Sequence, residues 1–257
     1  YSTIAAFMWM MTTLFSMEYF ACHGNSGRYC FFSLLTCGAT MGVFLSDSLF
    51  TLFLFFEIMG LTSFVMVIQE ETAAAGRAAR TYLAIAVIGG LCALFGIFMI
   101  AAGTGNLSMD SLEQFRKATG GTWPLYLAGA LLLAGFGAKA GMYPLHVWLP
   151  NAHPVAPAPA SALLSGILTK TGVFGILTMF RHDRVWGMVL LAPGAVTMVL
   201  GAILAVFSID LKRTLACSSM SQIGFILTGC SMQCLLGEEN GLAVSGTVLH
   251  MVNHSMI

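Results

Sequence analysis

The stretch GAKAGMYPLHVWLPNAHPVAPAPASALLSGILTKTGVFG (137–175) places two lysines, Lys139 and Lys170, inside otherwise apolar runs. Toward the N-terminus, the apolar run LFTLFLFFEIMGLTSFVMVI (49–68) holds a third ionisable residue, Glu57. A charge at the centre of a bilayer costs about 2.5–3.5 kcal/mol even on insertion scales. A chain that carries three such charges at this cost is expected to need them for its function. We interpret them as stations on a path for protons or other ions.

The composition is that of a membrane protein. Only 9% of the residues are charged and 58% are hydrophobic, whereas a soluble domain carries about 25% charged residues. Apolar runs of about 20 residues recur, which predicts a polytopic integral membrane protein. The 11 basic and 11 acidic residues give no net charge, which argues against nucleic acid as a partner.

The length of the runs and their lack of period-2 alternation favour α-helices over barrel strands. We therefore predict an all-α polytopic fold, with connections at the polar segments 69–80 and 104–122 and a ninth span that begins near Gly241 and is cut short. The chain stops inside this apolar stretch, so we expect it to be a piece of a larger protein. The eight complete spans are expected at about 3–21, 30–46, 49–69, 81–102, 123–149, 158–180, 187–208 and 213–233.

A break is expected in the fifth span, close to Lys139. Gly141 and Pro144 follow the lysine, and Pro150 opens a stretch (150–159) with four of the seven prolines in the chain. Proline removes a backbone donor and clashes with the preceding turn. Irregular backbone is tolerated at membrane depth only where it is buried or lines a cavity. An ordinary proline-kinked helix followed by a proline-rich loop fits the composition equally well.

Glu57 and Lys139 are expected to face each other across the bundle. Opposite charges in a dry interior favour each other's ionised forms, and direct or one-water contact corresponds to roughly 3–7 Å. Such a pair can act as a proton switch, or it can be a static ion pair that fixes helix register. Lys170 has no partner visible in the sequence. We expect polar side chains or water to join it to Lys139 through Ser161, Ser165, Thr169 and Thr171.

Two histidines, His250 and His254, lie four residues apart on one helical face. The motif H-M-V-N-H lacks the glutamate of H-E-x-x-H and has no clear third ligand, so we expect no metal there. A proton relay is the better interpretation because imidazole titrates near neutral pH, and polar helix packing is the alternative. For His146 and His153, which flank the expected break, loop packing and proton uptake are equally plausible.

No cofactor is expected. The seven cysteines include no C-x-x-C pair, which argues against iron–sulfur or zinc ligation. The sequence contains no G-x-G-x-x-G and no G-x-x-x-x-G-K-[ST], so a nucleotide site is not supported.

The basic residues of alternate connections indicate an orientation. Five basic residues fall on one side of the membrane and four on the other, and this small excess favours the side with five as the cytoplasmic side. The first side has Arg28, Arg77, Arg80, Lys212 and Arg213, and the second has Arg116, Lys117, Arg181 and Arg184.

Four stretches resemble the antiporter-like proton-channel family. They are FFEIMGLTSF (55–64), the stretch 137–175, DLKRTLACSSMSQIGFIL (210–227) and LHMVNHS (249–255). That family contains the large membrane subunits of respiratory complex I (subunits 4, 5 and 2), of membrane-bound hydrogenases and of multisubunit sodium/proton antiporters.

The resemblance implies a fold of about fourteen helices with two five-helix units of inverted topology. It divides the chain into an N-terminal helix and loop (1–29), a complete first unit (30–181) and the start of the second unit (182–257). It also assigns proton-relay roles to Glu57, Lys139, Lys170, His250 and His254. The second broken helix would follow Ile257, and the membrane would be the inner membrane of a bacterium or archaeon.

The expected function is that of a proton-translocating subunit, not itself catalytic, of a complex I-like (NADH:quinone oxidoreductase-like) or membrane-bound hydrogenase complex. Its partners would be other membrane subunits and H⁺, or Na⁺ in place of H⁺. The alternative is the large subunit of a multisubunit Na⁺/H⁺ antiporter without redox coupling. A purely structural scaffold is a third class, and it predicts that Lys139 and Lys170 tolerate neutral substitution.

Overall fold

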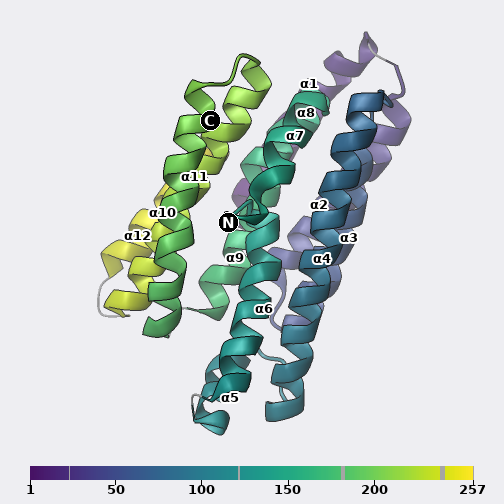
Figure 1. Cartoon of the computed structure of the whole chain (residues 1–257). Helices are drawn as coiled ribbons and strands as arrows, with labels where there is room; N and C mark the ends of the chain where they lie inside the picture. The colour runs from purple at the N-terminus through teal and green to yellow at the C-terminus, as the bar shows by residue number, and fades with distance from the viewer. Residues whose placement is uncertain (23, 121, 181–182, 238–240, 257) are drawn as a thin grey trace.

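The computed structural model describes residues 1–22, 24–120, 122–180, 183–237 and 241–256, and these residues form an all-helical bundle (Figure 1). Arg181 and the expected unit boundary at 181–182 therefore lie outside the described residues. Eight helical segments of the described chain are long and apolar enough to cross a membrane. The predicted all-α polytopic fold is confirmed.

The helices follow the predicted spans closely. Their bounds are α1 Ser2–Ala21, α2 Ser26–Leu45, α3 Leu49–Val67, α4 Ala73–Thr104, α5 Ser111–Thr119, α6 Trp123–Ala140, η1 Leu145–Val147, α7 Trp148–Val155, α8 Ala158–Leu163, η2 Leu164–Leu168, α9 Thr169–Met179, α10 Arg184–Val206, α11 Leu211–Leu236 and α12 Gly241–Met256.

Two helical segments were expected to be connections. α4 begins at Ala73 instead of near residue 81, because Thr72 caps it by accepting the Ala75 N–H at 3.0 Å and an alanine-rich turn follows. The segment 104–122 contains the short helix α5, which turns Leu112 and Phe115 toward the bundle and its charged residues outward. Both segments are too polar for apolar run length to reveal them as helices.

The predicted break lies directly after Lys139. α6 ends at Ala140, Gly141 adopts a left-handed φ of 81°, and the Met142 N–H donates to the Gly137 carbonyl at 2.9 Å. This is the usual glycine C-cap, in which the turn satisfies carbonyls left at a helix end. Beyond Pro144, the 3₁₀ turn η1 leads into α7. Pro150 lies in the first turn of α7, where a missing N–H is tolerated.

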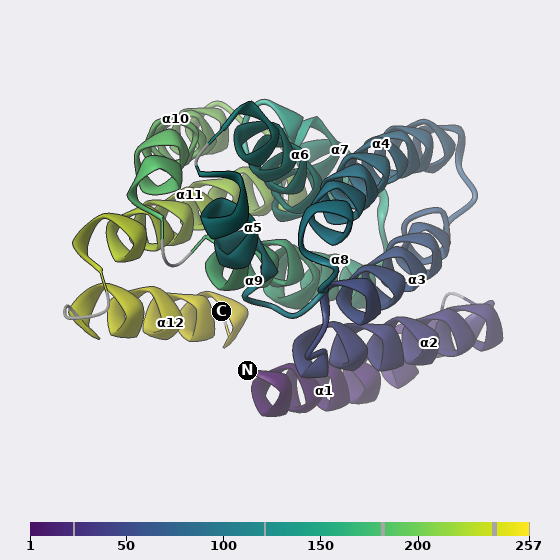
Figure 2. The same cartoon turned by 90° about the horizontal axis from the view of Figure 1, so that it is seen from below.

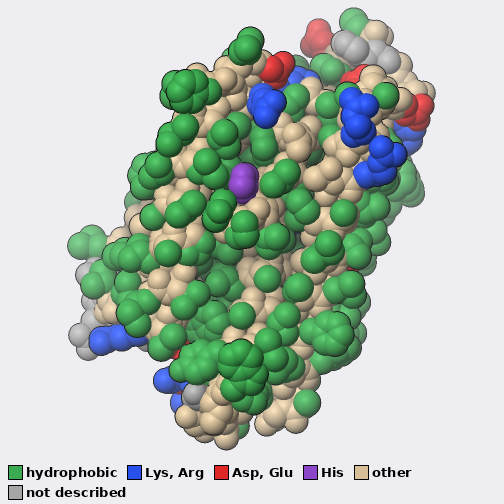
Figure 3. All heavy atoms as spheres, in the orientation of Figure 1, with side chains coloured by type: hydrophobic (Ala, Val, Ile, Leu, Met, Phe, Trp, Pro, Cys, Tyr) green, Lys and Arg blue, Asp and Glu red, His purple; other side chains and the backbone are tan. Residues whose placement is uncertain are grey.

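The broken segments form the centre of the bundle. Figure 2 shows α8 and α9 in the middle, with α6, α11 and α12 on one side and α1, α2 and α3 on the other. The outer helices turn large apolar side chains outward, and Figure 3 shows hydrophobic side chains spread over one face with charged side chains toward its two ends. This distribution is that of a protein that contacts lipid along its flanks.

α10 and α11 approach each other closely at glycines. A Cβ at Gly224 would collide with the backbone of Met198, and a Cβ at Gly201 would collide with the backbone of Ser221. Small residues at such positions let helix backbones touch, which is how membrane helices associate.

We therefore expect Gly224→Ala to destabilise the protein by about 1–3 kcal/mol, because overpacking forces the backbones apart. The measurement is the temperature at which detergent-purified protein loses monodispersity in size-exclusion chromatography. Gly38→Ala is the matched control, since a Cβ there has no neighbour within 4 Å. Equal transition temperatures for the two variants would contradict the close-packing argument.

Candidate functional site

Lys139 is held near the end of α6 by a tyrosine. The lysine is 4% exposed, and its ammonium donates to the Tyr82 hydroxyl at 2.6 Å. The same nitrogen lies 4.9 Å from the centroid of the Tyr82 ring. The ring faces of aromatic residues attract cations. The buried ammonium therefore has a neutral partner that both hydrogen-bonds it and stabilises its charge.

Tyr82 connects three helices. It lies in α4 with 1% of its surface exposed, and its hydroxyl is 2.5 Å from the Ser63 hydroxyl of α3. Its ring packs edge-to-face on Trp148 at 5.0 Å, and the Trp148 Nε1–H donates across the break to the Ala138 carbonyl at 2.8 Å. Ser63, Tyr82 and Lys139 thus form a chain of two hydrogen bonds, and the packing of Trp148 on the Tyr82 ring holds this chain in place. Sequence reasoning missed Tyr82, because a span that starts at residue 81 places it at the membrane surface, where tyrosine is common.

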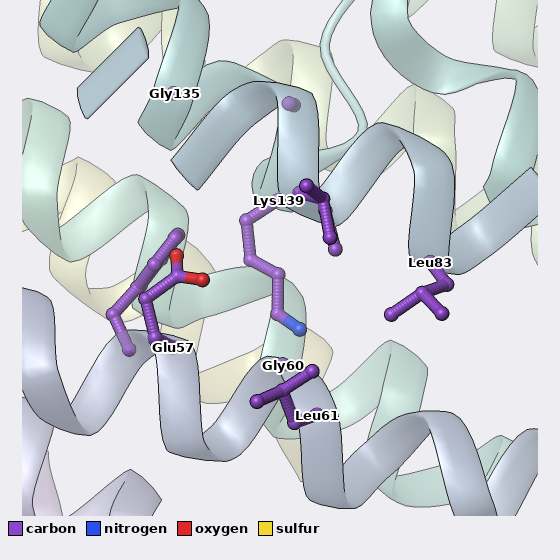
Figure 4. A pocket seen from close by; sticks show the side chains of 10 residues that line it. Glu57, Gly60, Leu61, Leu83, Gly135 and Lys139 are labelled. Atoms are coloured by element: carbon purple, nitrogen blue, oxygen red, sulfur yellow. The ribbon is translucent and has the colours of Figure 1, made fainter. Parts of the chain in front are cut away.

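Glu57 and Lys139 line one small cavity between α3, α4 and α6. Figure 4 shows the carboxylate of Glu57 and the ammonium of Lys139 reaching into this space. The cavity has a volume of ≈ 10 Å³, at the lower limit for one water molecule. A Cβ at Gly90 would occupy the position of the Glu57 carboxylate, so the glycine makes room for it.

The two charges are close enough to interact electrostatically, yet no ion pair joins them directly. The sequence led us to expect direct or one-water contact between Glu57 and Lys139; the direct hydrogen bond to the ammonium comes from Tyr82, and Glu57 lines the cavity that the lysine enters. Glu57 therefore faces the same cavity as Lys139 without being its direct partner.

Lys170 has a partner that lies 84 residues away along the chain. The side chain is fully buried at the start of α9; its Nζ donates to the Ser165 carbonyl at 2.6 Å and lies 2.7 Å from Nδ1 of His254. An ammonium donates to a neutral imidazole, and a neutral amine accepts from an imidazole N–H. The contact therefore serves both protonation states of the pair.

The backbone around Lys170 is specialised. Residues Leu164–Leu168 form the π-helical segment η2, directly before α9. Segments of this kind widen a helical turn and recur at functional sites. Here the wider turn places the Ser165 carbonyl within reach of the lysine five residues later.

α12 docks on this widened turn. Ser255 donates to the Gly166 carbonyl at 2.8 Å, next to the His254–Lys170 contact. His250 does not hydrogen-bond Lys170, although it interacts with it electrostatically. Its Nε2 is buried without a hydrogen-bond partner among the described residues, and its ring lies 5.8 Å from that of Phe225. Of the two histidines expected in the relay, only His254 contacts a lysine in the part of the chain that the structure describes.

The two histidines near the break differ. His146 stacks on Tyr143 at a centroid distance of 5.6 Å and is partly exposed. His153 is 2% exposed; its Nδ1 lies 2.8 Å from the Ser161 hydroxyl, and its Nε2 has no partner within the described chain. Electrostatically it interacts with Lys170 and Lys212. Because its imidazole is buried near Lys170 with one nitrogen unpaired, His153 is a candidate for proton transfer. The sequence alone had left this role and loop packing equally open.

The hydroxyls expected between the lysines have other partners. Ser161 contacts His153, and Ser165 lies 2.5 Å from Ser219 of α11. Thr169 and Thr171 of α9 donate to the Ser165 and Leu168 carbonyls of the preceding segment, Leu164–Leu168. Among the described residues, hydrogen bonds do not run continuously from Lys139 to Lys170. The site therefore consists of a Lys139 cluster (Glu57, Ser63, Tyr82, Lys139) and a Lys170 cluster (Ser165, Lys170, Ser219, His254), and their connection stays a prediction.

The described residues also show no metal-binding geometry. No group of three or more His, Cys, Asp or Glu side chains among the described residues could hold an ion. The seven cysteines are free thiols.

Comparison with known proteins identifies the family of this chain. Residues 46–257 match the family described as "NADH:quinone oxidoreductase/Mrp antiporter, TM". The chain belongs to this family. The resemblance inferred from the four sequence stretches is confirmed, and the chain is an integral membrane protein of the antiporter-like family, whose relatives are named as components of hydrogenase, quinone oxidoreductase and antiporter complexes.

Several curated relatives are similar over most of the chain. Hydrogenase-4 component B of Escherichia coli (strain K12) is 32% identical over 261 residues, which is 96% of this chain and 38% of the relative. A Na(+)/H(+) antiporter subunit of Alkalihalophilus pseudofirmus is 31% identical over 89% of this chain and 46% of the relative. NAD(P)H-quinone oxidoreductase chain 4 1 of Synechococcus sp. (strain JA-3-3Ab) is 33% identical over 88% of this chain and 43% of the relative.

Solved structures share the fold. A chain of the Mrp complex from Dietzia sp. DQ12-45-1b superposes with a TM-score of 0.85 over 99% of this chain and 48% of that chain, at 23% identity. A chain of the membrane-bound sulfane sulfur reductase, an archaeal respiratory membrane complex, gives a TM-score of 0.81 at 29% identity, over 99% of this chain and 43% of that chain. The chain thus spans less than half the length of these relatives.

The Lys139 cluster leads to a structural prediction. Tyr82→Phe removes the hydroxyl that the ammonium uses, and a hydrogen bond to a charged group contributes about 1.5–3 kcal/mol. We expect Lys139 to turn across the cavity and form a direct ion pair with Glu57, while the ring keeps its packing on Trp148. A cryo-EM structure of the variant would show this rotation.

Tyr126→Phe is the control for this experiment, since Tyr126 lies in the same helix as Lys139 but is 38% exposed. An ammonium that keeps its position in Tyr82→Phe would show that the hydroxyl does not hold it.

Proposed function

We propose that the chain translocates protons as a membrane subunit of a redox-driven complex of the complex I or hydrogenase type. The observation that carries this proposal is a pair of buried lysines, each hydrogen-bonded to a titratable side chain, Tyr82 for Lys139 and His254 for Lys170. Charges at this depth are costly and are normally retained for ion pathways. Relatives that are named as hydrogenase and quinone oxidoreductase components support the redox-driven class.

The mechanism starts with the two possible partners of Lys139. With its ammonium on Tyr82, Lys139 holds a proton that Glu57 stabilises only across the cavity. A change in charge near Glu57, set by a redox event elsewhere in the complex, alters the affinity of Lys139 for this proton. The proton then moves toward Lys170 and is exchanged with His254 through their direct contact.

We also propose the family's division of the chain, with 30–181 as the first five-helix unit and 182–257 as the start of the second. In this division the Lys170–His254 contact crosses from one unit to the other. His254 then serves as the first proton acceptor of the second unit, and His250, one turn earlier in α12, follows it.

Neutralising either lysine tests the relay. Lys139→Met and Lys170→Met should each lower proton uptake roughly tenfold or more, since a loss of 1.4 kcal/mol in the transition state already corresponds to about a tenfold change. Assembly should persist, because a neutral side chain is easier to bury than an ammonium. The measurement is proton uptake by the assembled complex in vesicles, with Lys117→Met on the exposed face of α5 as the control. Unchanged proton uptake in both variants would contradict the relay and leave only a purely structural role for the chain.

A Na⁺/H⁺ antiporter without redox coupling is the second candidate, favoured by the 31% identity with the Na(+)/H(+) antiporter relative. The two candidates differ in their driving force. We expect proton uptake to require the electron donor and to be the same in sodium and potassium media. Uptake that follows an imposed sodium gradient in the absence of an electron donor would establish the antiporter instead.

A further inference from the structure

A groove lies at one end of the bundle, apart from both lysine clusters. It has a volume of ≈ 490 Å³ and is lined by the first turns of α4, by α7 and by the start of α11. Arg77 and Arg213 line it from α4 and α11, and Thr81 and Asn151 add polar groups. None of these residues takes part in the contacts that hold Lys139 or Lys170.

The groove has unsatisfied positive charge. Arg77 and Arg213 are exposed, and neither forms an ion pair with any residue that the structure describes. By contrast, Arg28 pairs with Glu71. Asp210 also lines the groove, but its carboxylate caps α11 by accepting a hydrogen bond from the backbone N–H of Arg213 at 2.9 Å, and it forms no ion pair with the Arg213 guanidinium. The N-terminal ends of α4 and α11 add the positive ends of two helix dipoles.

An apolar hollow continues the groove. This second hollow, of ≈ 350 Å³, shares Pro150, Asp210 and Arg213 with the groove and is lined beyond them by Leu204, Phe207 and Ile209. Phe207 is 80% and Ile209 103% exposed. Side chains so apolar are not expected in water beside guanidinium groups. An acyl chain next to a phosphate has this combination of apolar and anionic surface.

The position along the helices fits a lipid headgroup. α10 ends at Val206, α11 begins at Leu211 and α4 begins at Ala73, so the groove lies where spanning helices emerge. Arg77 is four residues into α4, about 6 Å along its axis at 1.5 Å per residue. Figure 3 shows basic side chains gathered toward the upper end of one face, with hydrophobic side chains around and below them. Basic residues at this level attract anionic lipids.

We propose that this groove binds an anionic phospholipid. Its phosphate lies between the guanidinium groups of Arg77 and Arg213, and an acyl chain covers Phe207 and Ile209. The lipid connects the start of α11 to α4 and α7. Next to Arg213, Lys212 already donates to the Ala156 carbonyl at 2.9 Å, so the bound lipid and this hydrogen bond together fix α11 against the end of α7.

The test is native mass spectrometry of the assembled complex after delipidation and addition of phosphatidylglycerol, phosphatidylcholine or inorganic phosphate. We expect phosphatidylglycerol to be retained at least about tenfold better than phosphatidylcholine, and sodium chloride to weaken its binding. Arg77→Gln/Arg213→Gln should abolish this preference, and Arg77→Lys/Arg213→Lys should keep most of it. Lys117→Gln/Arg184→Gln is the matched control, because it removes two exposed cations from the opposite end of the bundle.

Three results would overturn the proposal. In the first, the glutamine variant keeps the full preference for phosphatidylglycerol. In the second, inorganic phosphate competes as well as the lipid does, which would assign the groove to a soluble anion. In the third, the glutamine variant loses a neighbouring protein while lipid binding is unchanged, which would assign the groove to an acidic segment of a protein partner. If the glutamine variant does not assemble, the lysine variant and the lipid competition on the parent decide the question.

Discussion

The fully buried amino group of Lys170 is the constraint on which the centre of this bundle depends. A polar group sealed among apolar helices, whether charged or neutral, is tolerated only with hydrogen-bond partners close by. Two features provide them: the π-helical turn, which presents the Ser165 carbonyl, and α12, which presents His254. Ser255 fastens α12 to the same turn through the Gly166 carbonyl. One buried lysine therefore accounts for an irregular helix and for the docking of a helix that is distant along the chain.

The second lysine depends on a different device. Breaking α6 after Lys139 leaves carbonyls without helical partners, and Gly137 and Ala138 find theirs locally. Gly137 accepts from the Met142 N–H, and Ala138 accepts from Trp148. Trp148 in turn packs on Tyr82, whose hydroxyl holds the lysine. The break is therefore a rigid support for the ammonium, as expected where irregular backbone lies at membrane depth.

The spans and the break could be predicted from the sequence, because apolar run length and the Gly141–Pro144 signal act locally. The partners of the lysines could not. His254 reaches Lys170 only through the packing of α12 on the π-helical turn, and a π-helical turn has no reliable local signature. Tyr82 was missed because the polar first turns of α4 were interpreted as a connection, which placed Tyr82 at the end of a span instead of inside one. α5 was missed because it is short and amphipathic, so run length does not detect it.

The pairing of Lys139 with Tyr82 bears on how the two clusters can communicate. A lysine locked onto Glu57 would be a static ion pair, and a change of field near Glu57 would have to break that pair before a proton could move. In the observed arrangement the ammonium rests on a neutral hydroxyl while the carboxylate lies across a small cavity. In the mechanism that we propose, the Lys139 ammonium has two possible partners of different charge, Tyr82 and Glu57, and both a nearby charge and the proton on Lys139 bias the choice between them. That is the physical requirement for coupling two sites, and it does not need a permanent hydrogen-bonded chain between them.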